Sequence, residues 1–411
     1  MIKRSLEGSL RAALGDTPVV MLVGARQTGK STLVTALAEA ANGSYSSFDD
    51  PAMLAAARAD PVGFTERLGD HAVLDEVQRA PEIFLPIKAA VDRDRRPGRF
   101  LLTGSANPLF VPEVAEALAG RMEVLPLWPF SAAELAGNEG LRFAELVLDP
   151  DAGPPTPVSV KRESLVERIL AGGFPEAVER SEPERRGRWF SSYLITILER
   201  DVRSLADIAR LEQLPSMLGA IALRTRGTLN KSTLSQDLGI PGSSVDRYLA
   251  LLERVFLVRR LPAWHNRFGP RLVKAPKLLV CDSGLLCHLL QWEGERLLSD
   301  PTSFGLALEC FVGMELAKAV DVDPKAPRLM HYRTSKGAEI DFIIEASDGR
   351  IAAVEVKASS SVEESDVRHM AQLRDAMGPR FVRGIALYGG ERALPFGDRL
   401  DAWPVSALWS T

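Results

Sequence analysis

The chain has 411 residues, of which 46% are hydrophobic and 25% are charged, and 50 Lys and Arg stand against 54 Asp and Glu for a formal net charge of −4. This composition is that of a folded globular protein and excludes disordered, collagen-like and disulfide-scaffold classes. The three cysteines form no C-x-x-C pair, and no apolar run approaches the roughly 20 residues that span a bilayer. We therefore expect a cytoplasmic protein of two or three domains, without a membrane segment.

Residues 1–150 are predicted to form an α/β domain. Short apolar runs at 18–23, 71–74 and 99–103 alternate with helical stretches such as 31–41. Such alternation is typical of a parallel sheet with crossover helices. A proline-rich stretch at 149–160 then predicts a linker, followed by a helical region at 161–275 and a second α/β region at 276–411.

The first candidate site follows the apolar run VVMLV. Residues 24–31 read G-A-R-Q-T-G-K-S and match the P-loop pattern G-x-x-x-x-G-K-[ST], with a helical stretch behind them. Gly24 and Gly29 let backbone N–H groups curl around phosphates. Lys30 is then expected to reach the β and γ oxygens of a nucleotide, Ser31 to ligate Mg²⁺, and Thr32 to contact the α-phosphate.

An acidic pair ends the next apolar run, HAVLDE. Asp75 is predicted to orient Mg²⁺ through its water ligands, and Glu76 to act as the general base for an attacking water. Asp49 and Asp50, which are neighbours in the sequence, are a weaker alternative for the metal role, because no long apolar strand precedes them.

Two further positions complete the predicted nucleotide site. The run at 99–103 leads into G-S-A-N, which places Ser105, or alternatively Thr103, where a side chain could sense the γ-phosphate. Arg121 follows a helical stretch and precedes MEVLPL, a position from which an arginine could reach the nucleotide of a neighbouring subunit. The alternative for Arg121 is an ordinary charge at a helix C-terminus. Acting across subunits would require at least a dimer, so a homo-oligomer is an open expectation.

The nucleotide is predicted to be ATP, since no N-K-x-D motif that reads guanine lies downstream. The motifs GARQTGKST, AVLDEVQRAPE, LLTGSANP, LAGRMEVLPL, AGGFPEAV and YLITILERDVR together resemble those of prokaryotic AAA-type ATPases with an appended C-terminal domain of unknown function. This resemblance covers nearly the whole chain and implies ATP binding and hydrolysis. The matching functional positions are Lys30, Asp75, Glu76, Ser105 and Arg121.

The middle region, 161–275, contains a predicted helix–turn–helix. Helical stretches at 230–238 and 243–254 flank a Gly-Ile-Pro turn, and residues 255–261 are expected to form a wing hairpin, so that the segment resembles a winged helix. Residues 185–277 carry 17 Lys and Arg against 7 Asp and Glu, as expected for a surface that contacts a phosphate backbone. Such a unit can equally serve for packing. Four arginines are candidates for nucleic-acid contact: Arg247, Arg254, Arg259 and Arg260.

A second constellation lies near the C-terminus. Two strand runs, GAEIDFII and IAAVEVK, are joined by a turn and predict a hairpin that brings Asp341 beside Glu355 and Lys357. Glu309, on a preceding helical stretch, can complete the cluster. This D…E-x-K arrangement resembles the restriction-endonuclease-type core, which implies that Glu309, Asp341 and Glu355 ligate Mg²⁺ and that Lys357 assists hydrolysis of a phosphodiester. A salt-bridged surface hairpin is the alternative.

These observations predict an AAA-type ATPase coupled to a nucleic-acid-binding C-terminal domain, with DNA favoured as partner and nuclease activity left open. The alternative is a nucleotide-switched regulator that binds DNA or a protein without cutting. A small-molecule kinase is a weaker third option, because nothing in the chain indicates a lid or an acceptor pocket.

Overall fold

The protein is described by a computed structural model that covers residues 2–40, 42–106, 118–140, 142–156, 158–202, 212–265 and 273–410. It divides into two compact units, one made of residues 6–129 and 254–256, the other of residues 1–5, 130–253 and 257–411. This division differs from the three predicted ranges, because the first unit stops at residue 129 rather than 150 and the later two ranges share one unit. Residue 41 and residues 107 and 108 of the LLTGSANP motif lie outside the described residues.

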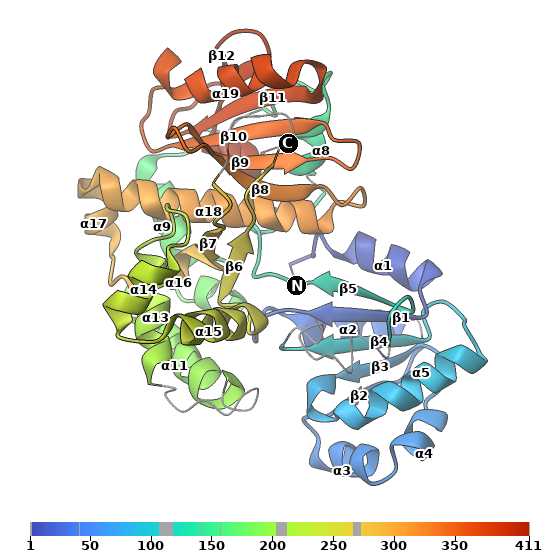
Figure 1. Ribbon diagram of the computed structural model, residues 1–411. Coiled ribbons are helices and arrows are strands. Elements are labelled where there is room, and N and C mark those ends of the chain that lie inside the picture. Colours follow the sequence, from blue (N-terminus) through green and yellow to red (C-terminus); the bar gives the residue numbers. More distant parts are fainter. Residues whose placement is uncertain are drawn as a thin grey trace. The chain divides into compact units, whose positions relative to one another are not determined.

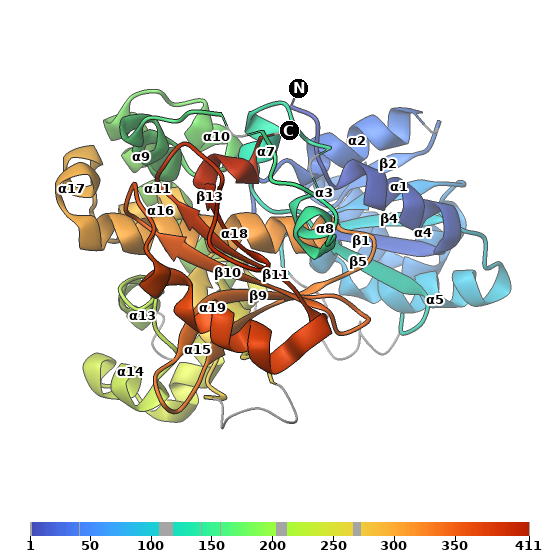
Figure 2. The ribbon, with the colours of Figure 1, turned by 90° about the horizontal axis from the view of Figure 1, so that it is seen from above.

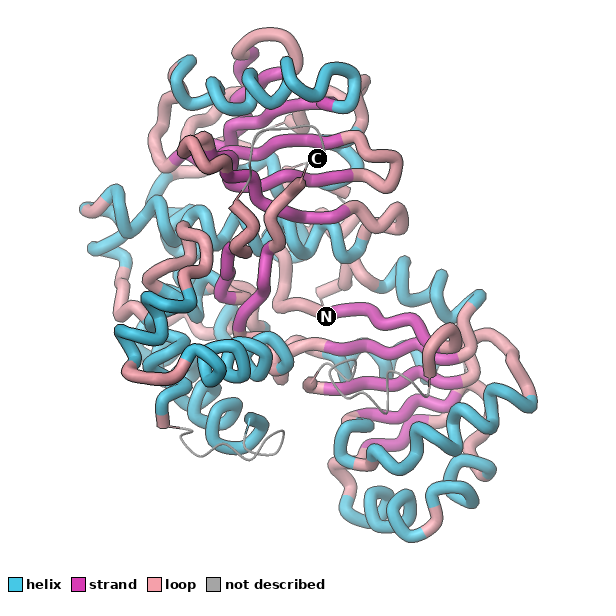
Figure 3. The backbone as a smooth tube through the Cα atoms, in the orientation of Figure 1, coloured by secondary structure: helices cyan, strands magenta, loops and turns pink. Residues whose placement is uncertain are grey.

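The N-terminal unit is built on a parallel sheet with the strand order β2-β3-β4-β1-β5 (Figures 1 and 3). The predicted α/β class with a parallel sheet is confirmed here. Its strands are β1 (Val19–Val23), β2 (Tyr45–Ser47), β3 (Ala72–Asp75), β4 (Phe100–Gly104) and β5 (Met122–Pro126). Its helices are α1 (Glu7–Asp16), α2 (Lys30–Ala40), α3 (Pro51–Ala59), α4 (Pro61–Glu66) and α5 (Phe84–Arg93), with short 3₁₀ turns at Val77–Arg79 and Pro81–Ile83.

The strand order places the predicted nucleotide-site residues together. Strands β3, β4 and β1 are neighbours, and each ends at the same edge of the sheet because all run parallel. All five residues of β1 and all five of β4 are buried, as expected for strands covered on both faces. The segments that follow β1, β3 and β4 therefore meet at one edge.

The second unit begins with helices and a helix–turn–helix. The helices are α7 (Ala132–Leu135), α8 (Phe143–Leu148), α9 (Arg162–Ala171), α10 (Pro175–Val178), α11 (Pro183–Thr196), a π-helical turn (Ile197–Val202), α13 (Gln213–Ala222), α14 (Lys231–Leu238) and α15 (Gly242–Arg254). Gly239 ends α14 in the left-handed conformation, which glycine adopts without steric cost. The amphipathic face predicted for α15 is confirmed, because Val245, Tyr248, Leu249 and Leu252 are buried.

The wing differs from the prediction. Residues 255–261 contain one strand, β6 (Val258–Leu261), and its antiparallel partner is the distant β7 (Lys277–Val280) rather than a local hairpin strand. The sequence could not reveal this pairing, because it depends on a contact between segments separated by a long connection.

The C-terminal part is a mixed sheet with the order β12-β13-β11-β10-β9-β8. Its strands are β8 (Arg328–Arg333), β9 (Glu339–Glu345), β10 (Ile351–Lys357), β11 (Phe381–Tyr388), β12 (Leu394–Pro395) and β13 (Leu400–Pro404), and its helices are α16 (Ser283–Leu289), α17 (Gly294–Ser299), α18 (Pro301–Val322) and α19 (Glu364–Met377). The predicted hairpin is β9 with β10, which pair antiparallel. Figure 1 shows the sheet between α19 and α18.

Both faces of this sheet are packed against helices (Figure 2). Ile343 belongs to the core cluster with Val367 and Met370 of α19. On the other face the Phe342 ring lies so close to Gly313 of α18 that a Cβ there would approach the ring to 2.7 Å. Within the described part of the chain, no helix is long and apolar enough to cross a membrane.

Candidate functional site

The P-loop joins β1 to α2 with the geometry that the motif predicts. A Cβ on Gly24 would lie 2.2 Å from the carbonyl oxygen of Leu127, and Gly29 has a φ of +90°, so each position requires glycine. The buried Lys30 ammonium points back into the loop, where it donates hydrogen bonds of 2.8 Å to the carbonyl oxygens of Gly24 and Ala25. These contacts hold the amine at the mouth of the loop, where phosphate oxygens would replace the carbonyls.

Asp75, the last residue of β3, collects three hydroxyl donors. The Ser31 hydroxyl donates to its Oδ2 at 2.9 Å, the Tyr45 hydroxyl donates to the same oxygen at 2.8 Å, and the Thr103 hydroxyl contacts Oδ1. Burial and the Asp75 carboxylate together raise the pKa of Tyr45 to about 12. A hydroxyl and a carboxylate side by side beneath a P-loop fit the oxygen ligands that Mg²⁺ prefers, so Ser31 and Asp75 suit the metal role.

Glu76 follows in the left-handed conformation, with a φ of +59°. Its N–H donates to the Thr103 hydroxyl at 3.1 Å, and the Ser105 hydroxyl donates to its Oε2 at 3.0 Å. Gln78 donates from Nε2 both to this Oε2 and to Ser105 Oγ, the latter at 2.8 Å. The structure therefore brings the predicted base and sensor together, with Gln78 between them. Sequence reasoning missed Gln78 and Tyr45, which no motif spacing singles out.

Arg121 lies at the other end of the sheet. It directly precedes β5, so it belongs to the edge opposite the P-loop of its own chain. Its guanidinium donates to Asp92 Oδ1 at 2.6 Å and lowers the pKa of that carboxyl. Arg95 and Arg121 both line a pocket of about 470 Å³ on this edge. Arg121 therefore lies too far from the P-loop of its own chain to contact a nucleotide bound there.

The weaker metal candidates have other structural tasks. Asp50 is the N-cap of α3 and accepts a hydrogen bond from the Ala52 N–H at 2.8 Å, while Asp49 forms an ion pair with Arg79.

Thr32, the residue predicted to contact the α-phosphate, lies in the first turn of α2 with an exposed side chain.

In the second unit, the β9–β10 hairpin brings Asp341 beside Glu355 and Lys357 as predicted. Asp341 Oδ2 accepts from the Val356 N–H at 2.9 Å, and the Asp341 N–H donates to Glu355 Oε2 at 3.4 Å. The Lys357 ammonium donates to Glu355 Oε1 at 3.1 Å and lies 3.2 Å from an oxygen of Asp366.

Glu309 of α18 completes this acidic cluster. Two basic side chains that the sequence did not predict contact its carboxylate. The Lys277 ammonium contacts Glu309 Oε1 and lies 3.7 Å from Asp341 Oδ1, and Arg226 donates from Nε to Glu309 Oε2 at 2.8 Å. Lys277 is only 1% exposed. The only sequence signal for it is a lysine that opens the apolar run KLLV.

Burial is the main cause of altered ionisation in this cluster. It raises the pKa of Glu309 to about 7 and that of Glu355 to about 8, with Asp341 adding a like charge to each. Every carboxylate oxygen of Glu309, Asp341 and Glu355 faces an N–H donor or an ammonium group. In the described residues, no group of three or more His, Cys, Asp and Glu could hold a metal ion. The residues present thus do not fit the divalent metal that a D…E-x-K core implies.

The helix–turn–helix shows fewer unpaired cations than its composition indicated. Arg259 forms an ion pair with Asp321 and Arg260 one with Glu253. Arg254 is half-buried, and burial lowers its pKa. Arg247 remains exposed on α15, where it lies over the ring of its neighbour Tyr248 at 5.5 Å.

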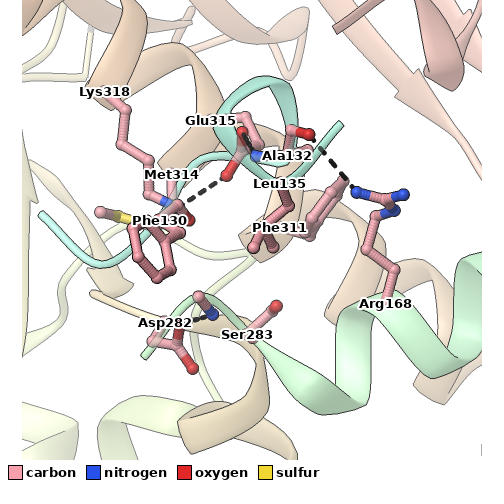
Figure 4. A pocket seen from close by; sticks show the side chains of 12 residues that line it. Phe130, Ala132, Leu135, Arg168, Asp282, Ser283, Phe311, Met314, Glu315 and Lys318 are labelled. Atoms are coloured by element: carbon pink, nitrogen blue, oxygen red, sulfur yellow. Dashed lines mark hydrogen bonds and ion pairs between the residues drawn. The ribbon is translucent and has the colours of Figure 1, made fainter. Parts of the chain in front are cut away.

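A further polar cluster anchors the first segment of the second unit (Figure 4). Glu315 of α18 accepts a hydrogen bond of 2.7 Å from the Ala132 N–H, the first of α7, and Lys318 donates to the Phe130 carbonyl at 2.9 Å. The Asp282 carboxylate accepts from the Gly173 N–H at 2.7 Å. The cavity among these residues, about 10 Å³, has room for about one water molecule, so the cluster is a packing node rather than a ligand site.

Three family models match the chain in succession. Residues 16–136 match the AAA domain model. These residues form an AAA-type P-loop domain. Residues 162–296 match a domain of unknown function (DUF8612), and residues 304–408 match another (DUF4143). The AAA domain thus contains the P-loop, the Asp75–Glu76 pair, Ser105 and Arg121.

The similarity to related sequences extends beyond the AAA domain. The chain is 29% identical over its full length to an uncharacterized protein of Mycobacterium tuberculosis, of which it covers 85%. A protein of Haemophilus influenzae is 25% identical over 59% of this chain and 58% of its own length.

Three solved structures with similar elements have low identity to the chain. A Walker-type ATPase of Pyrococcus abyssi has 16% identity and a TM-score of 0.46 over 71% of this chain and 96% of its own. The RuvB Holliday junction branch migration motor of Thermotoga maritima has 18% identity and a TM-score of 0.27, covering 63% and 86%. AMPPCP-bound DnaA from Aquifex aeolicus has 13% identity and a TM-score of 0.30, covering 60% and 86%.

Proposed function

We propose that the protein binds and hydrolyses ATP at the P-loop and uses the cycle to control nucleic-acid contact by its second unit. The observation that carries the ATPase proposal is the convergence of Lys30, Ser31, Asp75, Glu76 and Ser105 at the carboxyl edge of one parallel sheet. No single one of these residues specifies the reaction; the set supplies a phosphate cradle, metal ligands, a base and a sensor.

In this proposal the chain's own groups divide the work. The loop N–H groups and Lys30 hold the triphosphate, and Lys30 leaves the carbonyls of Gly24 and Ala25 to do so. Ser31 and Asp75 would hold Mg²⁺, which neutralises charge on the phosphate oxygens. Glu76 takes a proton from the attacking water, and Ser105, which already contacts Glu76, registers whether the γ-phosphate is present.

Arg121 is proposed to act on the nucleotide of a neighbouring copy. Its position at the amino edge of the sheet, away from its own P-loop, supports action between subunits rather than within one. The Asp92 carboxylate holds the guanidinium until a neighbour's phosphates replace it.

Nucleic acid is the proposed binding partner of the second unit, and DNA is favoured over RNA. The helix–turn–helix of α14 and α15 and the exposed Arg247 support this, and the excess of cations between residues 185 and 277 favours a polyanion. Since Arg259 and Arg260 are paired with carboxylates, fewer arginines are available for nucleic-acid contact than the composition of this region indicated. A nucleotide-switched regulator that binds a protein through this surface is the alternative.

The decisive experiment measures ATP binding and turnover in the wild type, Lys30→Ala and Glu76→Gln. We expect Lys30→Ala to lose binding, and Glu76→Gln to keep binding while losing turnover by at least about a hundredfold. Lys336→Ala, which removes an exposed lysine of the second unit, serves as the control. Turnover that is unchanged in Lys30→Ala would show that the P-loop is not the site of hydrolysis.

A further inference from the structure

Lys277 is a buried cation placed inside an acidic cluster. It opens β7, its side chain is 1% exposed, and its ammonium lies against Glu309 of α18, 3.7 Å from Asp341 of β9 and 5.2 Å from the centre of the Phe342 ring. A buried ammonium is costly unless carboxylates and other acceptors surround it. The carboxylates of Glu309 and Asp341 therefore stabilise the buried Lys277 ammonium.

Each carboxylate oxygen of the cluster faces a donor or a cation. Lys277 and Arg226 contact the two oxygens of Glu309, the Val356 N–H donates to Asp341 Oδ2, and the Lys277 ammonium lies 3.7 Å from Asp341 Oδ1. Lys357 and the Asp341 N–H contact the two oxygens of Glu355. A hard divalent cation needs oxygen lone pairs directed at one point. Such an ion would have to displace the donors and the cations that these oxygens already face.

The cluster also supplies cations of its own. Glu309 contacts Arg226 and Lys277, Lys277 also lies near Asp341, and Lys357 contacts Glu355 and Asp366. Arg226 lies between α13 and α14 and Lys277 opens β7, whereas the acids come from α18 and the β9–β10 hairpin. A divalent ion placed here would meet the Lys277 ammonium at short range, and like charges at short range repel.

We propose that the Lys277 ammonium is a built-in counter-ion between Glu309 and Asp341, and that it excludes a divalent metal from the D…E-x-K cluster. The second unit then carries the side chains of a metal-dependent nuclease core in a form that takes no metal. The ammonium instead ties the β6–β7 strand pair to α18 and the C-terminal sheet, because Lys277 of β7 contacts Glu309 of α18 and lies 3.7 Å from Asp341 of β9.

The test measures Mn²⁺ binding by electron paramagnetic resonance and calorimetry in the full chain without nucleotide. Four proteins are compared: the wild type, Asp341→Asn, Lys277→Met, and Lys277→Met with Asp341→Asn. Methionine keeps the length of the lysine and removes its charge. Lys274→Met, three residues earlier and exposed, is the matched control.

We expect the wild type and Asp341→Asn to bind Mn²⁺ alike, so that none of the binding depends on Asp341. Lys277→Met should gain a site in the millimolar range or tighter, and adding Asp341→Asn should remove it. Lys274→Met should behave as the wild type does.

Two results would overturn the proposal. One is a Mn²⁺ site in the wild type that Asp341→Asn abolishes, which can be observed even if Lys277→Met does not fold. The other is a folded Lys277→Met, verified by circular dichroism, that gains no site, because Lys277 would then not be what excludes the metal. Neither result depends on whether the P-loop hydrolyses ATP.

Discussion

The Ser31 hydroxyl donates a hydrogen bond of 2.9 Å to Asp75 Oδ2, joining the start of α2 to the end of β3. The two residues are 44 positions apart, and the contact exists because β1 and β3 both flank β4 in a parallel sheet. The oxygen atoms proposed to hold Mg²⁺ are therefore placed by the sheet and not by the P-loop alone.

Replacing Asp75 by Asn should weaken the use of Mg²⁺. The amide loses the negative charge that favours the cation, and we expect the Mg²⁺ concentration for half-maximal ATP turnover to rise about tenfold or more. Tyr45→Phe is the matched control, because it removes a hydrogen bond to the same carboxylate oxygen while leaving the carboxylate in place. Equal Mg²⁺ dependence in Asp75→Asn and the wild type would contradict the assigned role.

Gln78 restrains the proposed base. Its amide donates to both Glu76 and Ser105, so removing it should free the Glu76 carboxylate to meet water. A net hydrogen bond of about 1 kcal/mol corresponds to a rise of about fivefold in turnover for Gln78→Ala, with ATP affinity unchanged. Steady-state kinetics beside equilibrium binding separate the two effects, and a fall in turnover would assign Gln78 to positioning the base instead.

Arg121→Ala should slow ATP hydrolysis by about a thousandfold if the guanidinium stabilises charge on a neighbour's nucleotide. Turnover per chain in the wild type should then rise with protein concentration as copies associate. Arg93→Ala is the control, because Arg93 belongs to the same unit and is paired with Glu66 at the surface. An unchanged rate in Arg121→Ala would restrict the arginine to its contacts with Asp92 and the Ala119 carbonyl in its own chain.

Arg247→Ala should weaken DNA binding and lower the slope of log affinity against log salt by about one, as expected for one lost phosphate contact. Arg260→Ala, whose guanidinium is paired with Glu253, should change neither quantity. Fluorescence anisotropy over a series of salt concentrations measures both. Identical slopes for all three proteins would place the nucleic-acid surface elsewhere.

The acidic cluster should make stability depend on pH. The folded-state pKa of Glu355 is about 8, well above its ordinary value of 4.5, because the carboxyl is buried and faces Asp341. The folded state thus binds a proton that the unfolded state has released, and this contribution to stability is lost as pH rises from about 4.5 to about 8.

Glu355→Gln removes this ionisation. The variant should therefore gain stability relative to the wild type as pH rises through that window, by up to a few kcal/mol. Urea unfolding in EDTA at several pH values measures the difference. Parallel pH curves for the two proteins would contradict the raised pKa.

The sequence alone determined the features whose chemistry is local. Eight consecutive residues between an apolar strand and a helix define the P-loop, since its glycines and its lysine act through the adjacent backbone. The β9–β10 hairpin is similarly local, because two strand runs and a short turn lie together in the chain. For the same reason Asp341, Glu355 and Lys357 were predicted to meet, and they do.

Only the tertiary structure decided which distant groups complete each site. It paired β6 with β7 instead of a local wing strand, and in doing so it delivered Lys277 to Glu309 and Asp341. The motif D…E-x-K reports which acids are present, but their ability to bind a metal depends on the charge buried beside them. That charge comes from a lysine 64 positions before Asp341, and no spacing rule in the sequence connects the two, because burial and pairing arise only when the strands and helices pack.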